Sequence, residues 1–413
     1  MLMKLPKRFN LGIKLSLTAL FIIGLTIFGF MRSDRLGAVA ASPQSTKANV
    51  AASTCGSWSV VASPNFVTKP NYLFSVAAIS ASDIWAVGKY GNSIPRTLIE
   101  HWNGSKWSIT PRPAIANSSL NGVAALASND VWAVGDVLNV SYHTLIEHWN
   151  GSIWSVVPSP NTQAEDYLRG IAVVSPNDIW ATGETEDSIV GYHTLFEHWN
   201  GTQWSIIPSP DPGGSSNFLH LFSIAAVSSN NVWAVGDYYS KSSGTGGPLI
   251  EHWDGTQWSI IASPNAGTIS SGLRGVSVVS ANNIWAVGSY GAQSAGQTVG
   301  QTLVEHWNGT QWSVVSSPNA GQSVNQLTAI TAISATNIWA VGYYTDGSNP
   351  SFPPYYTLIE HWDGIQWSVI SSPNPGTFRN ILYGVTHVPG TRKVWSVGEF
   401  EGPGVQTLTE HYC

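Results

Sequence analysis

Charged residues and cysteines are scarce in this sequence. Only 10% of the 413 residues are Asp, Glu, Lys or Arg, against about 25% in an average soluble domain. Two cysteines are present, and no cysteine-based metal motif. Basic residues are concentrated at the start, so positions after 40 hold 12 basic and 23 acidic residues, a formal charge of -11. This sign argues against nucleic acid as a partner, because phosphate binding needs clustered Lys and Arg.

Long apolar runs are also scarce, and the one that stands out is residues 15–31. It follows four basic residues and precedes a small-residue cleavage signal at 38–40. We therefore expect residues 1–40 to be a signal peptide, or an N-terminal signal anchor where the run stays in the membrane. Residues 41–54, rich in Ala, Ser and Thr, are predicted to be a flexible linker. This predicts a secreted, extracellular protein, or a cell-surface protein that meets the membrane only through this segment.

Tryptophan is abundant, with 20 copies, and its copies belong to one repeated pattern. The pattern contains four elements, which in consensus are L-x-G-V-A-A-V-S, I-W-A-V-G, T-L-I-E-H-W and W-S-V-V. Each element occurs seven times, and successive copies of W-A-V-G are 47 to 56 residues apart. The W-A-V-G tryptophans are Trp85, Trp132, Trp180, Trp233, Trp285, Trp339 and Trp395.

Four short β-prone runs in a period of about 50 residues are typical of a propeller blade. We name the runs strands a, b, c and d in the order given above. Asn-Gly or Asp-Gly follows strand c in six copies, as at Asn103 and Gly104, and predicts a hairpin turn. The small residues of strand a suit the crowded centre, and the Ser-Pro after strand d suits an outer edge. The sequence predicts an all-β, seven-bladed β-propeller over residues 55–413, with four antiparallel strands per blade.

The repeats are out of phase with the chain ends. The propeller region begins with a lone strand d at Trp58 and ends with a lone strand c at residues 407–412. These two strands are therefore expected to pair and to close the ring as a clasp. Cys55 and Cys413 flank the same predicted hairpin, so in an oxidising compartment we expect a disulfide between them.

The strand b, Gly, strand c, Trp pattern resembles the kelch and galactose-oxidase type of propeller over residues 55–413. It departs from kelch in having one Gly after strand b where that family has a pair. The resemblance implies the propeller architecture, but no particular function, since propellers host binding, scaffolding and unrelated chemistries. The Cys–Tyr crosslink of copper oxidases with similar architecture has no counterpart here, because both cysteines are assigned to the clasp.

The Glu-His pair of strand c is chemically suggestive, because both residues serve as acid-base groups and metal ligands. It recurs in all seven copies, from Glu100 and His101 to Glu410 and His411. A residue present in every blade serves what every blade needs, whereas an active site is used once. We therefore interpret the pair as structural, with hydrogen bonds between blades.

Recognition is expected on the face that carries the d–a and b–c connections. The b–c connections hold 8 to 14 residues and differ in sequence, whereas the other turns are short and uniform. Variable loops on a rigid scaffold commonly carry binding sites. These loops are rich in tyrosine and include Tyr343 and Tyr344 as ligand-binding candidates, because amphipathic rings bind at low entropic cost.

Two positions near the predicted channel mouth break the repeat. The residue after W-A-V-G is acidic in several blades, which gives the candidates Asp136, Glu184, Asp237 and Glu399. Three of these acids fall in adjacent blades, where calcium is a possible ligand, although solvated carboxylates are the commoner case. The second position, in strand a, includes Arg169 and Arg274, which are candidates to clamp a carboxylate or sulfate or to form ion pairs with the acids.

Three functions are compatible with these observations. The first is a non-catalytic extracellular recognition or scaffold module that binds a surface polymer, protein or glycan, through its variable loops. The second is a glycosidase- or lyase-like enzyme that uses the axial carboxylates; no Ser, Cys or metal motif supports it. The third is a self-assembling surface structural protein.

Overall fold

The computed structural model describes residues 56–187, 191–210, 217–241, 244–264, 270–294, 297–348 and 353–413. All of them belong to one compact unit, Ala52–Cys413. The predicted signal segment 1–40, the linker 41–54 and Cys55 lie outside the described residues. Within the described part of the chain, no helix has the length and apolarity needed to cross a membrane.

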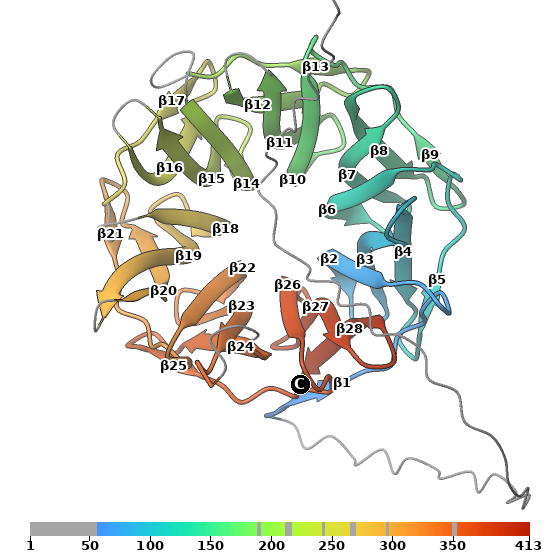
Figure 1. The fold of residues 1–413 in the computed structure, drawn as a ribbon. Coiled ribbons are helices and arrows are strands. Elements are labelled where there is room, and N and C mark those ends of the chain that lie inside the picture. Colours follow the sequence, from blue (N-terminus) through green and yellow to red (C-terminus); the bar gives the residue numbers. More distant parts are fainter. Residues whose placement is uncertain are drawn as a thin grey trace, which may run out of the picture. The chain divides into compact units, whose positions relative to one another are not determined.

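The described secondary structure consists of 28 strands. The innermost strands (Figure 1), of type a, are β2 (Asn71–Ser80), β6 (Ser118–Ala127), β10 (Glu165–Ser175), β14 (Asn217–Ser228), β18 (Ser271–Ser280), β22 (Val324–Ser334) and β26 (Asn380–His387). The b strands are β3 (Asp83–Tyr90), β7 (Asp130–Leu138), β11 (Asp178–Asp187), β15 (Asn231–Ser240), β19 (Asn283–Ser294), β23 (Asn337–Thr345) and β27 (Val394–Glu401).

The outer strands complete each set. The c strands are β4 (Arg96–Trp102), β8 (Tyr142–Trp149), β12 (Gly191–Trp199), β16 (Thr245–Trp253), β20 (Gln297–Trp307), β24 (Tyr355–Trp362) and β28 (Val405–Tyr412). The d strands are β1 (Trp58–Val60), β5 (Trp107–Ile109), β9 (Trp154–Val156), β13 (Trp204–Ile206), β17 (Trp258–Ile260), β21 (Trp312–Val314) and β25 (Trp367–Val369).

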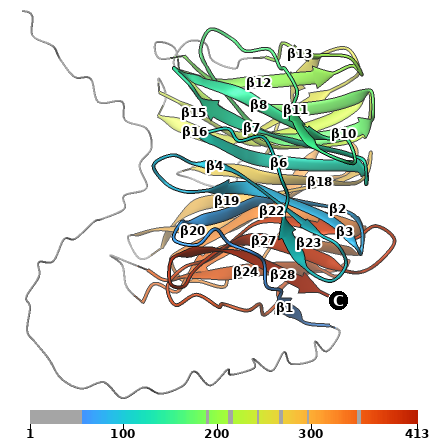
Figure 2. The same ribbon diagram turned by 90° about the vertical axis from the view of Figure 1, so that its right-hand side faces the viewer.

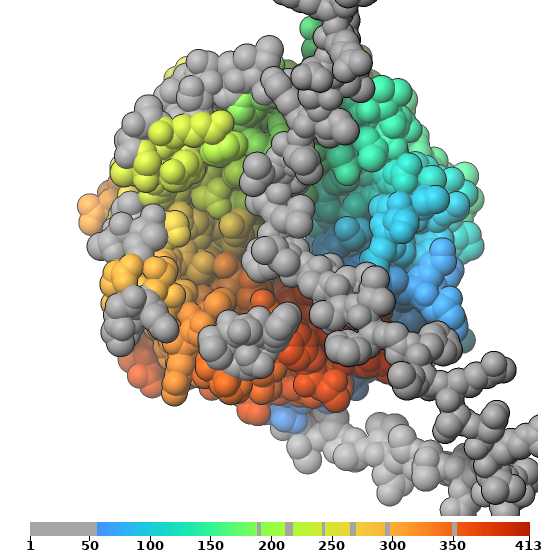
Figure 3. All heavy atoms as spheres, in the orientation of Figure 1, coloured from blue at the N-terminus to red at the C-terminus, as the bar shows by residue number. Residues whose placement is uncertain are grey.

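These strands form five four-stranded sheets and one eight-stranded sheet. The eight-stranded sheet contains two complete a–b–c–d sets, joined by a single parallel bridge between Tyr192 and Phe218. The a–b, b–c and c–d pairs within each set are antiparallel, as the hairpin turns predict. The sets follow one another around a common centre (Figures 1 and 3), and the view in Figure 2 shows them from the side. This is the arrangement of a β-propeller.

The first and last strands of the chain share one sheet, with the order β1-β28-β27-β26. Trp58 is paired with Tyr412, and Ser59 with His411, in antiparallel register. The predicted pairing of the two terminal strands is therefore present. The backbone N–H of Gly56 donates to the carbonyl oxygen of Cys413 at 3.1 Å. Because Cys55 lies outside the described residues, the disulfide stays a prediction.

The hydrophobic core lies between neighbouring sets of strands, and the alternation of strand b explains it. Trp85 and Val87 of β3 belong to one core cluster, together with Leu120 of the following set. Ile84, one position away, belongs to a different cluster, which includes Trp395 of the last set. Successive side chains of a strand point to opposite faces. The W-A-V-G element therefore buries both faces of its sheet against its two neighbours.

The Glu-His pairs are structural, as predicted, but the hydrogen bonds of the histidines lie within one set of strands and not between sets. His101 Nε2 lies 2.8 Å from Asp83 Oδ1, and the imidazole ring stacks on Trp85 with centroids 4.3 Å apart. The same His-to-strand-b hydrogen bond recurs in five further sets. Glu100 is fully buried, as are the other six glutamates at its position. These residues belong to the packing between sets and not to an open site.

The hydrogen bonds that we expected for the buried glutamates are only partly present. Glu305 accepts a hydrogen bond from Ser263 of the preceding set. Glu147 and Glu197 have no hydrogen bond of ordinary geometry among the described residues, and the nearby hydroxyl groups of Thr97 and Thr144 only partly oppose the effect of burial on their pKa. Burial raises the pKa of Glu147 to about 7 and that of Glu197 to about 8. A carboxyl group in this environment is stable in its protonated, neutral form.

Candidate functional site

Each a strand contains a β-bulge at the same position of the repeat. In the first set the register shifts between Leu73 and Ser75, and in the third between Leu168 and Gly170. A bulge leaves one residue unpaired and redirects its side chain. The bulged residues are Phe74, Asn121, Arg169, Phe222, Arg274, Thr328 and Tyr383.

The glycine of W-A-V-G makes room for this bulge. A Cβ atom on Gly183 would lie 1.9 Å from the carbonyl oxygen of Tyr167, just before the bulge on the paired strand. The other six glycines at this position meet the corresponding carbonyl at 1.8 to 2.0 Å. No side chain fits at such a distance, so glycine is required by the close approach of the two backbones. The repeat sequence therefore encodes the bulge that positions Arg169.

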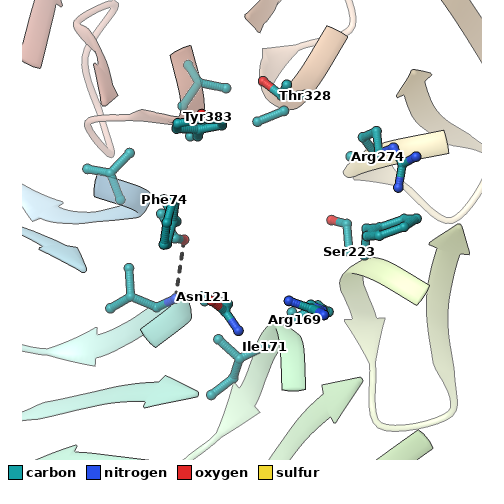
Figure 4. Close-up of a pocket in the computed structure, with 18 of the residues that line it drawn as sticks. Phe74, Asn121, Arg169, Ile171, Ser223, Arg274, Thr328 and Tyr383 are labelled. Atoms are coloured by element: carbon teal, nitrogen blue, oxygen red, sulfur yellow. Dashed lines mark hydrogen bonds between the residues drawn. The ribbon is translucent and has the colours of Figure 1, made fainter. Parts of the chain in front are cut away.

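The bulged residues surround a pocket at the centre of the propeller, with a cavity volume of about 170 Å³. All seven of them line it, together with the one or two residues that follow each on its strand. Figure 4 shows Arg169 and Arg274 on either side of Ser223, with Phe74 and Tyr383 across the opening. The repeat pattern marks this position as exceptional but does not predict the bulge.

Arg169 and Glu184, two of the predicted site residues, form an ion pair within one set of strands. Arg169 Nε and Nη2 donate to Glu184 Oε1 at 3.0 and 2.6 Å. The Arg169 side chain is 34% exposed, whereas that of Glu184 is only 3% exposed. Burial alone would lower the pKa of Arg169, but Glu184 and nearby Asp136 raise it above its ordinary value. The guanidinium group therefore faces the pocket as a permanent cation.

Asp136 occupies the same strand b position in the preceding set, and its partner is Asn121. Asn121 Nδ2 donates to Asp136 Oδ1 at 2.9 Å and to the carbonyl oxygen of Leu168, also at 2.9 Å. Burial raises the pKa of Asp136, although Arg169 and Asn121 act in the opposite direction. The bulged Asn121 thus connects this carboxyl group to the neighbouring a strand.

Asp237 connects two sets of strands. Its Oδ1 lies 3.0 Å from His220 Nδ1 on the adjacent a strand, and its Oδ2 lies 3.1 Å from Nη2 of Arg274 in the following set. The Arg274 guanidinium also stacks on Phe222, with its central carbon 3.7 Å from the ring centroid. Asp237 and Arg274 are predicted site residues, whereas His220, which lies two residues before the bulge, was not predicted.

The fourth acidic candidate, Glu399, is fully buried and has two partners. Arg379 Nε lies 2.7 Å from Glu399 Oε1, and the Tyr383 hydroxyl donates to the same oxygen at 3.0 Å. Burial raises the pKa of Glu399, although Arg379 and Tyr383 act in the opposite direction. Arg379 was missed because it lies in a connection outside the repeat. Its position one residue before β26 is the only sequence signal of its role.

The four acidic candidates are consequently not open ligands. None of them lines the axial pocket, and each accepts a hydrogen bond or ion pair from a neighbouring side chain. Among the described residues, no group of three or more His, Cys, Asp or Glu side chains could hold a metal ion. Calcium, which the sequence left open as the less common case, therefore has no ligand group in this part of the chain.

The two tyrosine candidates lie at the end of β23 and are half-buried. Tyr343 packs edge-on against Tyr355, with centroids 5.5 Å apart, and burial raises its pKa. Tyr344 stacks on Tyr356 and also packs against a core cluster. Tyr239, at the end of β15, is more accessible, with 46% of its surface exposed.

Comparison with known proteins identifies the fold. No protein-family model and no curated protein matches the sequence. Among solved structures, the chain is similar to YCF48 bound to D1 peptide and to YCF48 from Cyanidioschyzon merolae, each with a TM-score of 0.50 and 14% identity. These alignments cover 86% of this chain and 96% and 98% of those chains.

A third similar structure is the extracellular domain of the one component system BT4673 from B. thetaiotaomicron. It has a TM-score of 0.51 and 9% identity, and the alignment covers 87% of this chain and 40% of that chain. At these identities the likeness shows the β-propeller fold alone. It does not confirm the kelch-like subtype.

Proposed function

We propose that this chain is a non-catalytic recognition module outside the cell, a seven-bladed propeller whose d–a and b–c loops bind an extracellular protein. The observation that carries the proposal is the state of the central carboxylates. Glu184 and Glu399 are 2% and 0% exposed, and each is paired with an arginine. A carboxylate held in this way is poorly placed to donate a proton or to activate water. The glycosidase- or lyase-like alternative therefore ranks second.

The d–a and b–c loops, in contrast to the paired central carboxylates, expose apolar side chains that could contact a partner. Five exposed apolar side chains lie on d–a or b–c connections or at their edges: Val67, Ile94, Val140, Tyr239 and Phe378. Apolar and aromatic side chains at the centre of a contact surface supply most of its binding energy. Since they come from several sets of strands, they suit an extended partner better than a small ligand.

The comparisons support a protein partner over a glycan. One similar propeller was solved with a bound peptide, and another is an extracellular domain. Neither identifies the partner of this chain. A glycan partner, enzymatic release of fragments and self-association are the alternatives that the following experiment separates.

The full chain would be immobilised and exposed to arrays of extracellular-protein peptides and of polysaccharides, with retained ligand and released fragments both recorded. We expect peptides to be retained without cleavage, and retention to fall at least tenfold for Tyr239→Ala. The matched control is Val314→Ser, since Val314 is also 46% exposed but lies on the outer strand β21. Retention of glycans alone, release of fragments, or retention of neither ligand by a self-associating chain would each overturn the proposal.

A further inference from the structure

The axial pocket carries a charge opposite to that of the rest of the protein. Of the described residues that line it, Arg169 and Arg274 are the charged ones, although positions after 40 carry a formal charge of -11. We propose that this pocket binds the carboxylate of an organic acid with a planar apolar body, through these two guanidinium groups. The site is separate from the loops to which we assign the protein partner and does not depend on that proposal.

Both guanidinium groups are fixed in place before a ligand arrives. Arg169 uses Nε and Nη2 for Glu184, and its Nη1 has no hydrogen-bond partner among the described residues. Arg274 is held by Asp237 on one side and by the Phe222 ring on the other. Their side chains are 34% and 36% exposed, so donors remain accessible. Donors that are already oriented lose little entropy when they bind a carboxylate.

Part of the remaining wall of the pocket is aromatic. Phe74 and Tyr383 line it and pack edge to face with their centroids 5.5 Å apart. The Tyr383 ring is anchored by its hydrogen bond to Glu399. Asn121 and Thr328 also line the pocket, but both use their polar groups to bind the backbone of the next a strand. Phe74 and Tyr383 therefore offer an apolar face to a flat group, while the rest of the lining is mixed.

The carboxylates behind the arginines restrict the charge of the ligand. Glu184 and Asp237 already neutralise part of the positive charge on Arg169 and Arg274. A second negative charge in the pocket would be repelled by both acids. The arrangement consequently favours a monocarboxylate over a dianion such as sulfate.

The test is calorimetric titration of the full chain with phenylacetate, its neutral analogue phenylacetamide, and sulfate. We expect phenylacetate to bind one site per chain and the other two to bind at least tenfold more weakly. Arg274→Gln should weaken phenylacetate binding at least tenfold, whereas Arg392→Gln, on an exposed turn, should leave it unchanged. The double variant Arg169→Gln/Glu184→Gln removes the second cation without leaving a buried unpaired charge.

A second arm separates a free acid from a group carried by a partner. A short peptide ending in phenylalanine would be compared as free acid and as amide. Binding of phenylacetate alone assigns the pocket to a small molecule, and binding of the acid peptide alone assigns it to the partner's carboxylate. Equal binding of acid and amide, unchanged binding by the arginine variants, or no binding of any carboxylate would overturn the proposal. The Tyr239→Ala variant should not affect this titration, so its outcome is distinguishable from that of the peptide array.

Discussion

Arg169 donates two hydrogen bonds to a single carboxylate oxygen of Glu184, at 3.0 and 2.6 Å. Arg169 is the bulged residue of the a strand β10, and Glu184 follows W-A-T-G on the paired b strand β11. Asn121 with Asp136 and Tyr383 with Glu399 repeat the same relationship in two other sets. The two positions that break the repeat are the bulged residue of strand a and the residue after W-A-V-G on strand b. In these sets their side chains bind each other beside the central pocket.

A double-mutant cycle tests the coupling of Arg169 and Glu184. Arg169→Leu leaves the carboxylate of Glu184 buried without its cation, which is expected to lower the free energy of unfolding by about 3–5 kcal/mol. The double variant Arg169→Leu/Glu184→Leu should cost clearly less than the sum of the single variants. Urea denaturation measures all four proteins. If the losses in free energy of unfolding of the two single variants add up to that of the double variant, the two residues are not coupled.

The glycine of W-A-V-G is predicted to be essential for the bulge. Gly183→Ala places a Cβ atom 1.9 Å from the Tyr167 carbonyl oxygen, and the required backbone shift should cost about 3 kcal/mol or more. Gly300→Ala is the control, because its nearest neighbour lies at 3.5 Å and its backbone is not in the left-handed region. Thermal unfolding should separate the two variants. Similar melting temperatures would contradict the close approach of the two strands.

The buried glutamates are predicted to contribute more to stability in mild acid than in base. Burial raises the pKa of Glu197, Glu360 and Glu410 from 4.5 to about 8. Between these pH values the folded chain holds protons that the unfolded chain has lost, so the free energy of unfolding falls as pH rises. The stabilisation is complete below about pH 4.5 and is lost above about pH 8.

Urea denaturation at pH 5 and at pH 9 measures this dependence. Glu360→Gln keeps the shape of the protonated side chain but cannot ionise. It is expected to remove on the order of 3 kcal/mol from the difference between the two pH values. A variant with the same pH dependence as the original chain would show that Glu360 does not titrate in this range.

The clasp predicts a disulfide between Cys55 and Cys413. The unreduced, denatured chain should react with no thiol reagent, whereas the reduced chain should expose two thiols. Cys413→Ser should lower the free energy of unfolding by up to about 5 kcal/mol, since the bond closes most of the chain into one loop. The reduced original chain and the Cys413→Ser variant should then have the same free energy of unfolding. Two reactive thiols in the unreduced chain would disprove the bond.

The repeats made most of the fold predictable. Seven copies of four β-prone elements predict the a–b–c–d sets, and the out-of-phase ends predict that β1 pairs with β28. Local pattern suffices here because strand alternation and turn residues act between neighbours in sequence. The structural role of His101 and its counterparts was also predictable, since a residue that recurs in every set serves the packing of every set.

The axial site was predictable only in part. The composition of the repeat identified Arg169, Arg274 and the four acids as exceptional, and ion pairs between them were one of two alternatives that it left open. It did not show which acid pairs with which arginine. Arg379 was missed because it lies in a connection outside the repeat, and His220 was missed because a comparison of repeats treats each position separately. Their roles come from contacts between separate strands and connections.

The sequence by itself therefore determined the strands, their order within each set and the residues available at the centre, because these depend on local periodicity and turn chemistry. Only the tertiary structure decided which way those central residues point. The a strands meet around one axis, and each pairs with a glycine of strand b that lets its backbone bulge. That close approach places the guanidinium of Arg169 in the pocket and the carboxylate of Glu184 behind it, a division of roles that no periodicity in the sequence records.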